Sequence, residues 1–151
     1  QKIIILETRS DAMLEKLSPA IELTTIKEQE TVFEEGNSAD RFYMLKRGKI
    51  LLEKRISDHV TVSLGAIKPG YSFGWSAIFS EPYSFIAIGA EESEILTIKA
   101  DDIINLLESD HSMGFQVMRS LTRMMRNRMS RVEEQFLRSV REHRDIESLL
   151  T

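Results

Sequence analysis

Hydrophobic positions follow two different periods along this chain. Val60, Val62 and Leu64 alternate with polar or small residues, which predicts a strand with one face buried. From residue 100 onward, apolar residues instead recur every three or four positions, which is typical of amphipathic helices. The chain therefore divides into a β-rich part and a helical part.

Short strands separated by turn signals fill the β-rich part. Gly36-Asn37-Ser38, Ser57-Asp58 and Pro69-Gly70 mark turns between them. Many short strands at this spacing, with no helices between them, favour a closed barrel or jelly roll over a doubly wound sheet. The predicted strands span residues 21–30, 31–35, 41–46, 49–55, 60–64, 84–90 and 94–99.

Helices flank the strands on both sides. A short helix from Ser10 or Asp11 to Leu17 is ended by Pro19, and a second helix begins near residue 100. No proline occurs from residue 112 onward, so the sequence predicts one long amphipathic helix there. Its predicted apolar stripe consists of Met118, Leu121, Met125, Val132 and Phe136.

Composition and motifs exclude several classes of function. The 151 residues suit one domain, and the absence of cysteine excludes disulfides and thiolate metal sites. His59, His111 and His143 lack ligand spacing, so we predict no metal. No motif joins a nucleophile to a base, so we predict no enzyme. The apolar run at residues 3–6 is too short for a signal peptide or membrane span, so we expect a cytoplasmic protein without membrane contact.

Basic charge is concentrated in the long helix, where eight arginines lie between residues 119 and 144. Clustered basic charge is one footprint of nucleic-acid binding. An acidic β-rich part and the lack of a recognition motif favour a solvated face instead, so we expect no nucleic-acid partner for this chain alone. Arg128 lies beside the apolar stripe and would have to pair with an acidic group or lie at its rim.

The helix carries several methionines, which either line a cofactor site or pack on a partner. A helix too long to be buried on one small barrel favours the second choice, a coiled-coil-like homodimer. The residues concerned are Met118, Met124, Met125 and Met129.

Two segments carry a family resemblance. Residues 35–50 read EGNSADRFYMLKRGKI, in which Gly36 and Gly48 bracket a strand, and residues 69–74 read PGYSFG. Both resemble the signature of cyclic-nucleotide-binding domains. The resemblance implies a mainly β fold with flanking helices: an eight-stranded β-roll, or jelly-roll barrel, followed by a long C-terminal helix. Residues 1–111 would form the sensor part and residues 112–151 the dimerisation helix of the same domain.

The catabolite activator proteins of this family dimerise through the long helix and continue into a helix-turn-helix domain. Only a few residues follow the helix here, so we expect a stand-alone sensor domain or a fragment of a longer regulator.

The resemblance also implies a phosphate-binding cassette at residues 73–87. In the family this cassette reads Phe-Gly-Glu-x-Ala-Leu and later Arg-x-Ala. The Glu accepts the ribose 2′-hydroxyl, and the Arg binds the cyclic phosphate. Here Trp75 replaces the Glu, Ser84 stands in place of the Arg, and no Arg or Lys occurs between Lys68 and Lys99. Losing the arginine costs about 2–5 kcal/mol of binding, so cAMP and cGMP are disfavoured as ligands, and no cofactor is predicted.

An arginine from the long helix offers one means of compensation, with Arg119, Arg123 and Arg126 as candidates. A second hypothesis is that the pocket binds a different small molecule, with Ser76, Ser84 and helix N-terminal amides as polar groups. The candidate pocket residues are Phe73, Gly74, Trp75, Ser76, Ala77, Tyr83, Ser84, Phe85 and Ala87.

The sequence thus leaves three hypotheses of function. The first is a non-enzymatic regulatory sensor. The second is a ligand-free, degenerate barrel that acts as a dimerisation or protein-interaction module, with Trp75 and Phe85 filling the former pocket. The third is the ligand-sensing fragment of a transcription regulator.

Overall fold

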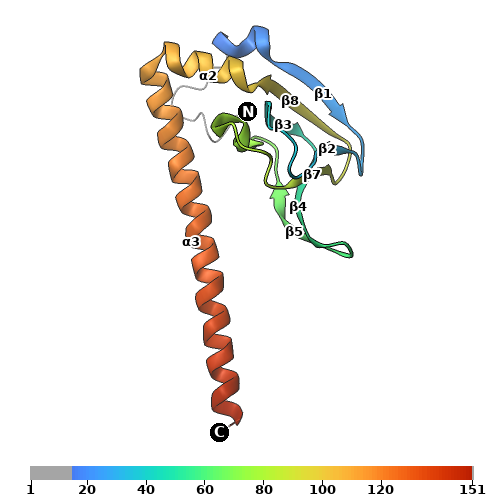
Figure 1. The fold of residues 1–151 in the computed structure, drawn as a ribbon, viewed down its shortest axis with the longest axis vertical. Helices are drawn as coiled ribbons and strands as arrows, with labels where there is room; N and C mark the ends of the chain where they lie inside the picture. Colours follow the sequence, from blue (N-terminus) through green and yellow to red (C-terminus); the bar gives the residue numbers. More distant parts are fainter. Residues whose placement is uncertain (1–14, 151) are drawn as a thin grey trace.

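Two antiparallel four-stranded sheets face each other and form the β-roll (Figure 1). The computed structural model describes residues 15–150, with side chains through residue 143. One sheet has the order β1 (Glu22–Ile26), β8 (Ser93–Lys99), β3 (Arg41–Arg47) and β6 (Ser72–Phe73). The other has the order β2 (Thr31–Phe33), β7 (Ile86–Gly89), β4 (Ile50–Ser57) and β5 (Val60–Ile67). The predicted β-roll is confirmed.

Helical segments accompany the roll and include η2 (Ser18–Ala20), η3 (Trp75–Phe79), α2 (Ala100–Ser109) and α3 (His111–Leu150). The long predicted helix is confirmed as α3, which runs from α2 past the roll and extends beyond it (Figure 1). Residues 15–17 are helical, whereas the predicted start of that helix at Ser10 or Asp11, and the apolar run at residues 3–6, lie outside the described residues. No helix within residues 15–150 is long and apolar enough to cross a membrane.

Strand β3 explains how the roll and the helices share one core. Four consecutive residues of β3 are buried because both faces of the strand are covered. Phe42 and Met44 pack in an outer cluster with residues of α2 and α3, whereas Tyr43 and Leu45 pack inside the roll. Each fully buried side chain of this kind contributes about 1.5–3 kcal/mol, so β3 ties α3 to the sheet.

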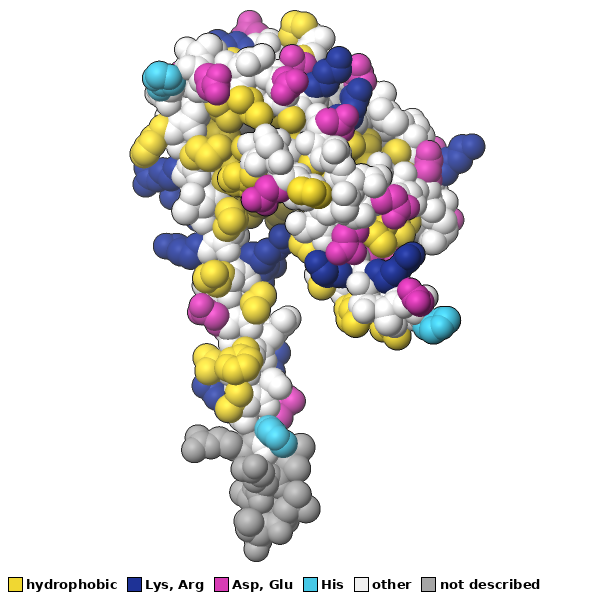
Figure 2. Space-filling view, in the orientation of Figure 1, with side chains coloured by type: hydrophobic (Ala, Val, Ile, Leu, Met, Phe, Trp, Pro, Cys, Tyr) yellow, Lys and Arg dark blue, Asp and Glu magenta, His cyan; other side chains and the backbone are white. Residues whose placement is uncertain are grey.

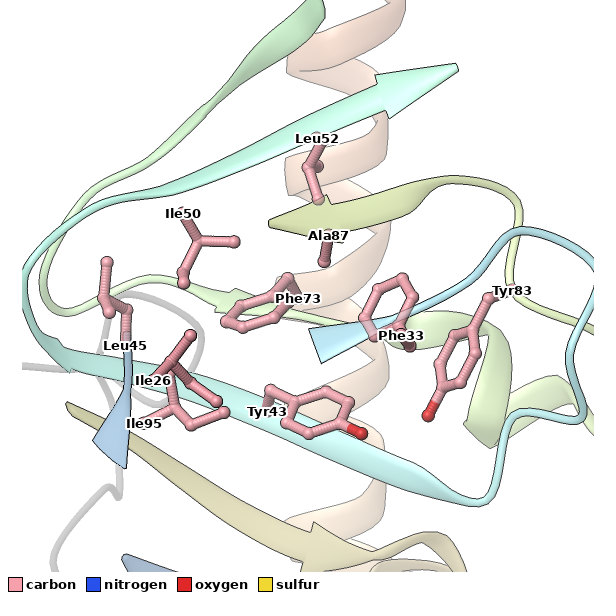
Figure 3. Packing of buried hydrophobic residues seen from close by; sticks show 10 residues of the cluster. All are labelled: Ile26, Phe33, Tyr43, Leu45, Ile50, Leu52, Phe73, Tyr83, Ala87 and Ile95. Carbon is pink, nitrogen blue, oxygen red and sulfur yellow. The ribbon is translucent and has the colours of Figure 1, made fainter. Parts of the chain in front are cut away.

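Aromatic packing inside the roll fixes the segment that follows η3 (Figure 3). Tyr83 stacks on Phe33 with ring centroids 3.9 Å apart. Its hydroxyl donates to the carbonyl oxygen of Arg41 at 2.7 Å and accepts from the Arg41 amide at 3.2 Å. Residues 83–85 are therefore anchored at one end by a buried ring and two hydrogen bonds.

Three details of the strands differ from the sequence prediction. The first strand ends at Ile26 instead of residue 30, because residues 27–30 form a turn in which Gln29 has a φ of 68°. Strand β6 is only two residues long, too short to show a period. The predicted buried face of β5 is wrong within this chain: Val60, Val62 and Leu64 are 49%, 37% and 51% exposed. Strand β5 is an edge strand that pairs only with β4.

Candidate functional site

A cavity of about 380 Å³ lies between the roll and α3. Its size falls in the usual range for small-molecule sites. Most of its lining residues come from four segments, which are β5, the stretch from Tyr71 to Ser76, the stretch from Tyr83 to Phe85, and the middle of α3; Phe33 of β2 and Leu52 of β4 complete it. The residues that line it are Phe33, Leu52, Leu64, Gly65, Ala66, Ile67, Tyr71, Ser72, Phe73, Gly74, Trp75, Ser76, Tyr83, Ser84, Phe85, Met124, Arg128, Arg131, Val132 and Gln135.

The structure brings most of the sequence-predicted pocket residues to this cavity. Seven of the nine line it, and these are Phe73, Gly74, Trp75, Ser76, Tyr83, Ser84 and Phe85. Ala77 and Ala87 do not line it, and both are buried elsewhere in the protein interior. Ala87 packs inside the roll and Ala77 in the short helix η3.

The backbone at Gly74 shapes one wall of the cavity. Gly74 has a φ of 81°, a left-handed conformation that favours glycine. A Cβ at this position would lie 2.8 Å from Cδ2 of Tyr43, so the turn packs closely on the core. Gly74 directly precedes η3, a five-residue 3-10 helix.

Trp75 packs sideways on the outer core and leaves the cavity open. Its ring lies 4.3 Å from that of Phe42, with a 58° angle between the planes, and it contacts the cluster beneath α3. Trp75 and Phe85 therefore form walls of a cavity that remains about 380 Å³ in volume. The two rings therefore do not fill the whole of the space between the roll and α3.

Two buried polar atoms at the cavity have no hydrogen-bond partner among the described residues. They are the Nε1 of Trp75 and the hydroxyl oxygen of Ser72, whose residue is only 6% exposed. An indole N–H can only donate, and a serine hydroxyl can both donate and accept. Buried polar groups are normally paired, and both of these atoms are enclosed by the surrounding protein.

Two arginines of α3 line the cavity, and they are not the ones that the sequence suggested. Arg128 and Arg131 line it, whereas Arg119, Arg123 and Arg126 do not. The guanidinium carbon of Arg128 lies 6.0 Å from the centre of the Phe85 ring, a cation–π distance. The sequence predicts that Arg128 pairs with an acidic group or lies at the rim of the apolar stripe. The structure instead places it against Phe85 of the cassette in its own chain.

A second cation lies near the same ring but is already paired. The Nζ of Lys54 is 5.9 Å from the centre of the Phe85 ring. It also lies 3.3 Å from the carboxylate of Glu35 and donates to the carbonyl oxygen of Ser84 at 3.4 Å. Lys54 does not line the cavity, so the cationic groups at the cavity come from α3.

The buried tyrosines beside the cavity remain neutral at ordinary pH. Burial, and then the hydrogen bond with Tyr83, raises the pKa of the Tyr43 hydroxyl well above its usual range. Burial likewise raises the pKa of Tyr83. Tyr83 therefore keeps the proton with which it holds Arg41.

The predicted dimer stripe is divided between two faces of α3. Met118, Met125, Val132 and Phe136 are exposed, at 37% to 67% of their surface. Leu121 is only 4% exposed and packs in the outer core, so its assignment to an exposed stripe is wrong. Figure 2 shows hydrophobic side chains along α3 where it extends beyond the roll.

Sequence reasoning missed Ser72, Arg128 and Arg131. Ser72 lies inside the PGYSFG segment, so its neighbours already pointed to the pocket. Arg128 follows the buried Leu121 by seven positions and Met124 by four, which places all three on one helix face. That signal becomes readable only when Leu121 is known to face the roll.

Comparison with known proteins identifies the family. The sequence model of the cyclic nucleotide-binding domain matches residues 23–110. No curated protein sequence matches the chain. The structure is similar to the N-terminal domain of a transcriptional regulator from Streptomyces coelicolor, with a TM-score of 0.70 and 21% identity over 82% of this chain and 87% of that one.

Two further solved structures are similar at 16% identity. One is the catabolite activator protein of Thermus thermophilus, with a TM-score of 0.74 over 87% of this chain and 61% of that one. The other is the regulatory domain of a Toxoplasma gondii PKA, solved with cAMP, with a TM-score of 0.69 over 83% of this chain and 46% of that one. The chain thus spans only part of these two proteins. Because the family model covers more than half of the chain and these structures share its fold, the chain belongs to the cyclic nucleotide-binding domain family.

Proposed function

We propose that this chain is a non-enzymatic regulatory sensor in which a small molecule in the cavity controls how α3 packs on the roll. The observation that carries this proposal is the origin of the cavity walls. They come from the cassette segments on one side and from Met124, Arg128, Arg131, Val132 and Gln135 of α3 on the other. A ligand there would contact both parts, and it shifts their arrangement only if it binds one arrangement better than another.

The output of the sensor is a homodimer formed through α3. The exposed apolar residues of α3 recur at alternating steps of four and three positions when Thr122 is included, which is the spacing of a coiled-coil seam. This seam adjoins the face that carries Leu121 and Arg128, and Val132 belongs to both because it also lines the cavity. The seam residues are Phe115, Met118, Thr122, Met125, Met129, Val132 and Phe136.

Both faces belong to one rigid element, so a ligand that moves α3 relative to the roll also moves the seam. The similar domain from Streptomyces coelicolor is the N-terminal part of a transcriptional regulator. If this chain is one part of a longer regulator, the sensor would act by moving α3 relative to the rest of that protein.

A ligand-free interaction module is the second candidate. The observation that favours it is the packing of Trp75 on Phe42, which makes the cassette part of the outer core. In this case the exposed row on α3 would mediate dimerisation or partner binding without regulation by a small molecule.

A screen of metabolites by thermal shift and tryptophan fluorescence separates the two candidates. Trp75 is the only tryptophan and lines the cavity, so its emission reports directly on occupancy. The sensor hypothesis predicts at least one compound that changes this emission saturably and stabilises the fold by about 1 kcal/mol or more. The thermal shift supplies a second readout that does not depend on the tryptophan. A complete lack of saturable responses in the wild-type protein supports the interaction module instead.

A further inference from the structure

We propose that the cavity binds an organic anion with an apolar or aromatic body, and that Arg128 of α3, not a residue of the roll, binds the charged group. This inference rests on the proposed sensor function and names its ligand class. It starts from the kinds of polar groups that the cavity presents.

The polar residues of the roll that line the cavity carry no negative charge. Trp75 stands where the family places a carboxylate that accepts a ribose hydroxyl, and an indole N–H can only donate. Ser72, Ser76 and Ser84 line the same cavity, and their hydroxyls can both donate and accept. The roll therefore places no carboxylate in the cavity that would repel an anion.

Charge points in the same direction. Arg128 and Arg131 line the cavity, and no Asp or Glu is among its lining residues within residues 15–143. Neither arginine forms an ion pair with a described side chain. The nearby carboxylate of Glu35 is held by Lys54 at 3.3 Å. Guanidinium groups bind carboxylates and phosphates through paired hydrogen bonds, so an anion is the ligand that this charge favours.

The remaining surface of the cavity defines the body of the ligand. The apolar residues that line it include the aromatic residues Phe33, Phe73, Trp75 and Phe85 and the aliphatic Leu52. Arg128 lies over the Phe85 ring, which orients the guanidinium beside this wall. An anion with an attached aromatic or aliphatic group would satisfy both parts of the cavity, whereas a free inorganic ion would satisfy only one.

The position of the arginine has a consequence for regulation. A cation in the roll would hold an anion without involving α3. A cation on α3 instead links the anion directly to the helix that carries the apolar seam. Binding of the anion therefore favours the arrangement in which Arg128 lies against the cassette. The size of this effect equals the difference in the anion's affinity for this arrangement and for one in which Arg128 lies away from the cassette.

The test compares aromatic anions with an uncharged compound of similar size. Phenyl phosphate, phenylacetate and benzyl alcohol are titrated into the full chain, with Trp75 fluorescence and calorimetry as readouts. Phenyl phosphate and phenylacetate distinguish a phosphate from a carboxylate ligand. The variants are Arg128→Gln and, as matched control, Arg119→Gln, which removes the same charge from an exposed position of α3 outside the cavity.

We expect at least one of the two anions to bind saturably and more tightly than benzyl alcohol. Arg128→Gln should weaken that anion about 10-fold, the effect of losing one charge-assisted hydrogen bond, and Arg119→Gln should change it less than about 2-fold. Added salt should weaken the anion and not benzyl alcohol.

Three results overturn the proposal while leaving the sensor function intact. They are tighter binding of benzyl alcohol than of either anion, equal effects of the two variants, and saturable binding by uncharged metabolites alone. Saturable binding by no compound, charged or uncharged, overturns both this proposal and the sensor function.

Discussion

The substitution Gly74→Ala tests whether the cassette turn is held by close packing on the core. At Gly74 the backbone has a φ of 81°, and a Cβ would lie 2.8 Å from Cδ2 of Tyr43 and 3.3 Å from the carbonyl oxygen of Arg41. A left-handed conformation costs a residue with a Cβ about 1–2 kcal/mol. Forcing an extra methyl into a packed core costs a further 1–3 kcal/mol or so. The sum is about 2–5 kcal/mol, a large part of the stability of a domain this size.

Gly36→Ala supplies the matched control. Gly36 has nearly the same φ, 87°, but a Cβ there would meet no atom within 4 Å. This variant should lose only the conformational part, about 1–2 kcal/mol. Urea unfolding followed by circular dichroism, at one protein concentration, gives both free energies of unfolding. If the two variants lose equal stability, the contact between Gly74 and Tyr43 is not the constraint that we describe.

Further predictions concern the buried tyrosines and the helix. Tyr83→Phe should cost about 1–3 kcal/mol in urea unfolding, because it leaves the backbone groups of Arg41 without their partner; no loss would contradict that bond. Burial raises the pKa of Tyr43 above its ordinary value of 10.0, so the folded state keeps the hydroxyl proton more firmly than the unfolded state does. The contribution of the protonated Tyr43 to stability is therefore complete below pH 10 and is lost as the pH rises further. The free energy of unfolding should therefore fall more steeply above pH 10 in the wild type than in Tyr43→Phe, and equal slopes would refute this. Met129→Glu should weaken the homodimer at least about 10-fold in sedimentation experiments, by placing a charge in an apolar seam. Asn127→Glu, off the seam, should leave the dimer intact; a monomeric wild type would refute the seam.

Most strands of the roll could be predicted from the sequence, because their apolar residues and the turn residues between them mark where each strand begins and ends. The strand predicted over residues 41–46 is confirmed as β3, and its four consecutive apolar residues are all buried. Strand β6 has only two residues, so no period could reveal it. In β5, alternation correctly predicted a strand at Val60, Val62 and Leu64. It could not show that no described residue buries these side chains.

The helix shows a similar limit. The spacing of apolar residues does not separate the two apolar faces of α3. The predicted stripe therefore contains both the buried Leu121 and the exposed Met125. Which face packs on the roll depends on how α2 and α3 meet at Gly114, where a Cβ would lie 2.8 Å from the carbonyl oxygen of Leu107. The direction in which α3 leaves α2 therefore decides which arginine of α3 lies near the cassette. The cassette residues could be predicted from a local motif, whereas Arg128 and Arg131 depend on tertiary packing.

Calorimetric titration of the full chain with cAMP and with cGMP tests the central claim most directly. That claim is that the cavity has exchanged a ribose acceptor for the donor Trp75 and an arginine of the roll for arginines of α3. For a nucleotide whose phosphate lies at the cassette, as the family resemblance implies, losing the arginine at position 84 costs about 2–5 kcal/mol, which moves a micromolar dissociation constant by roughly one and a half to three and a half orders of magnitude. The account predicts dissociation constants near millimolar, or no detectable heat. Low-micromolar binding of either nucleotide would contradict it.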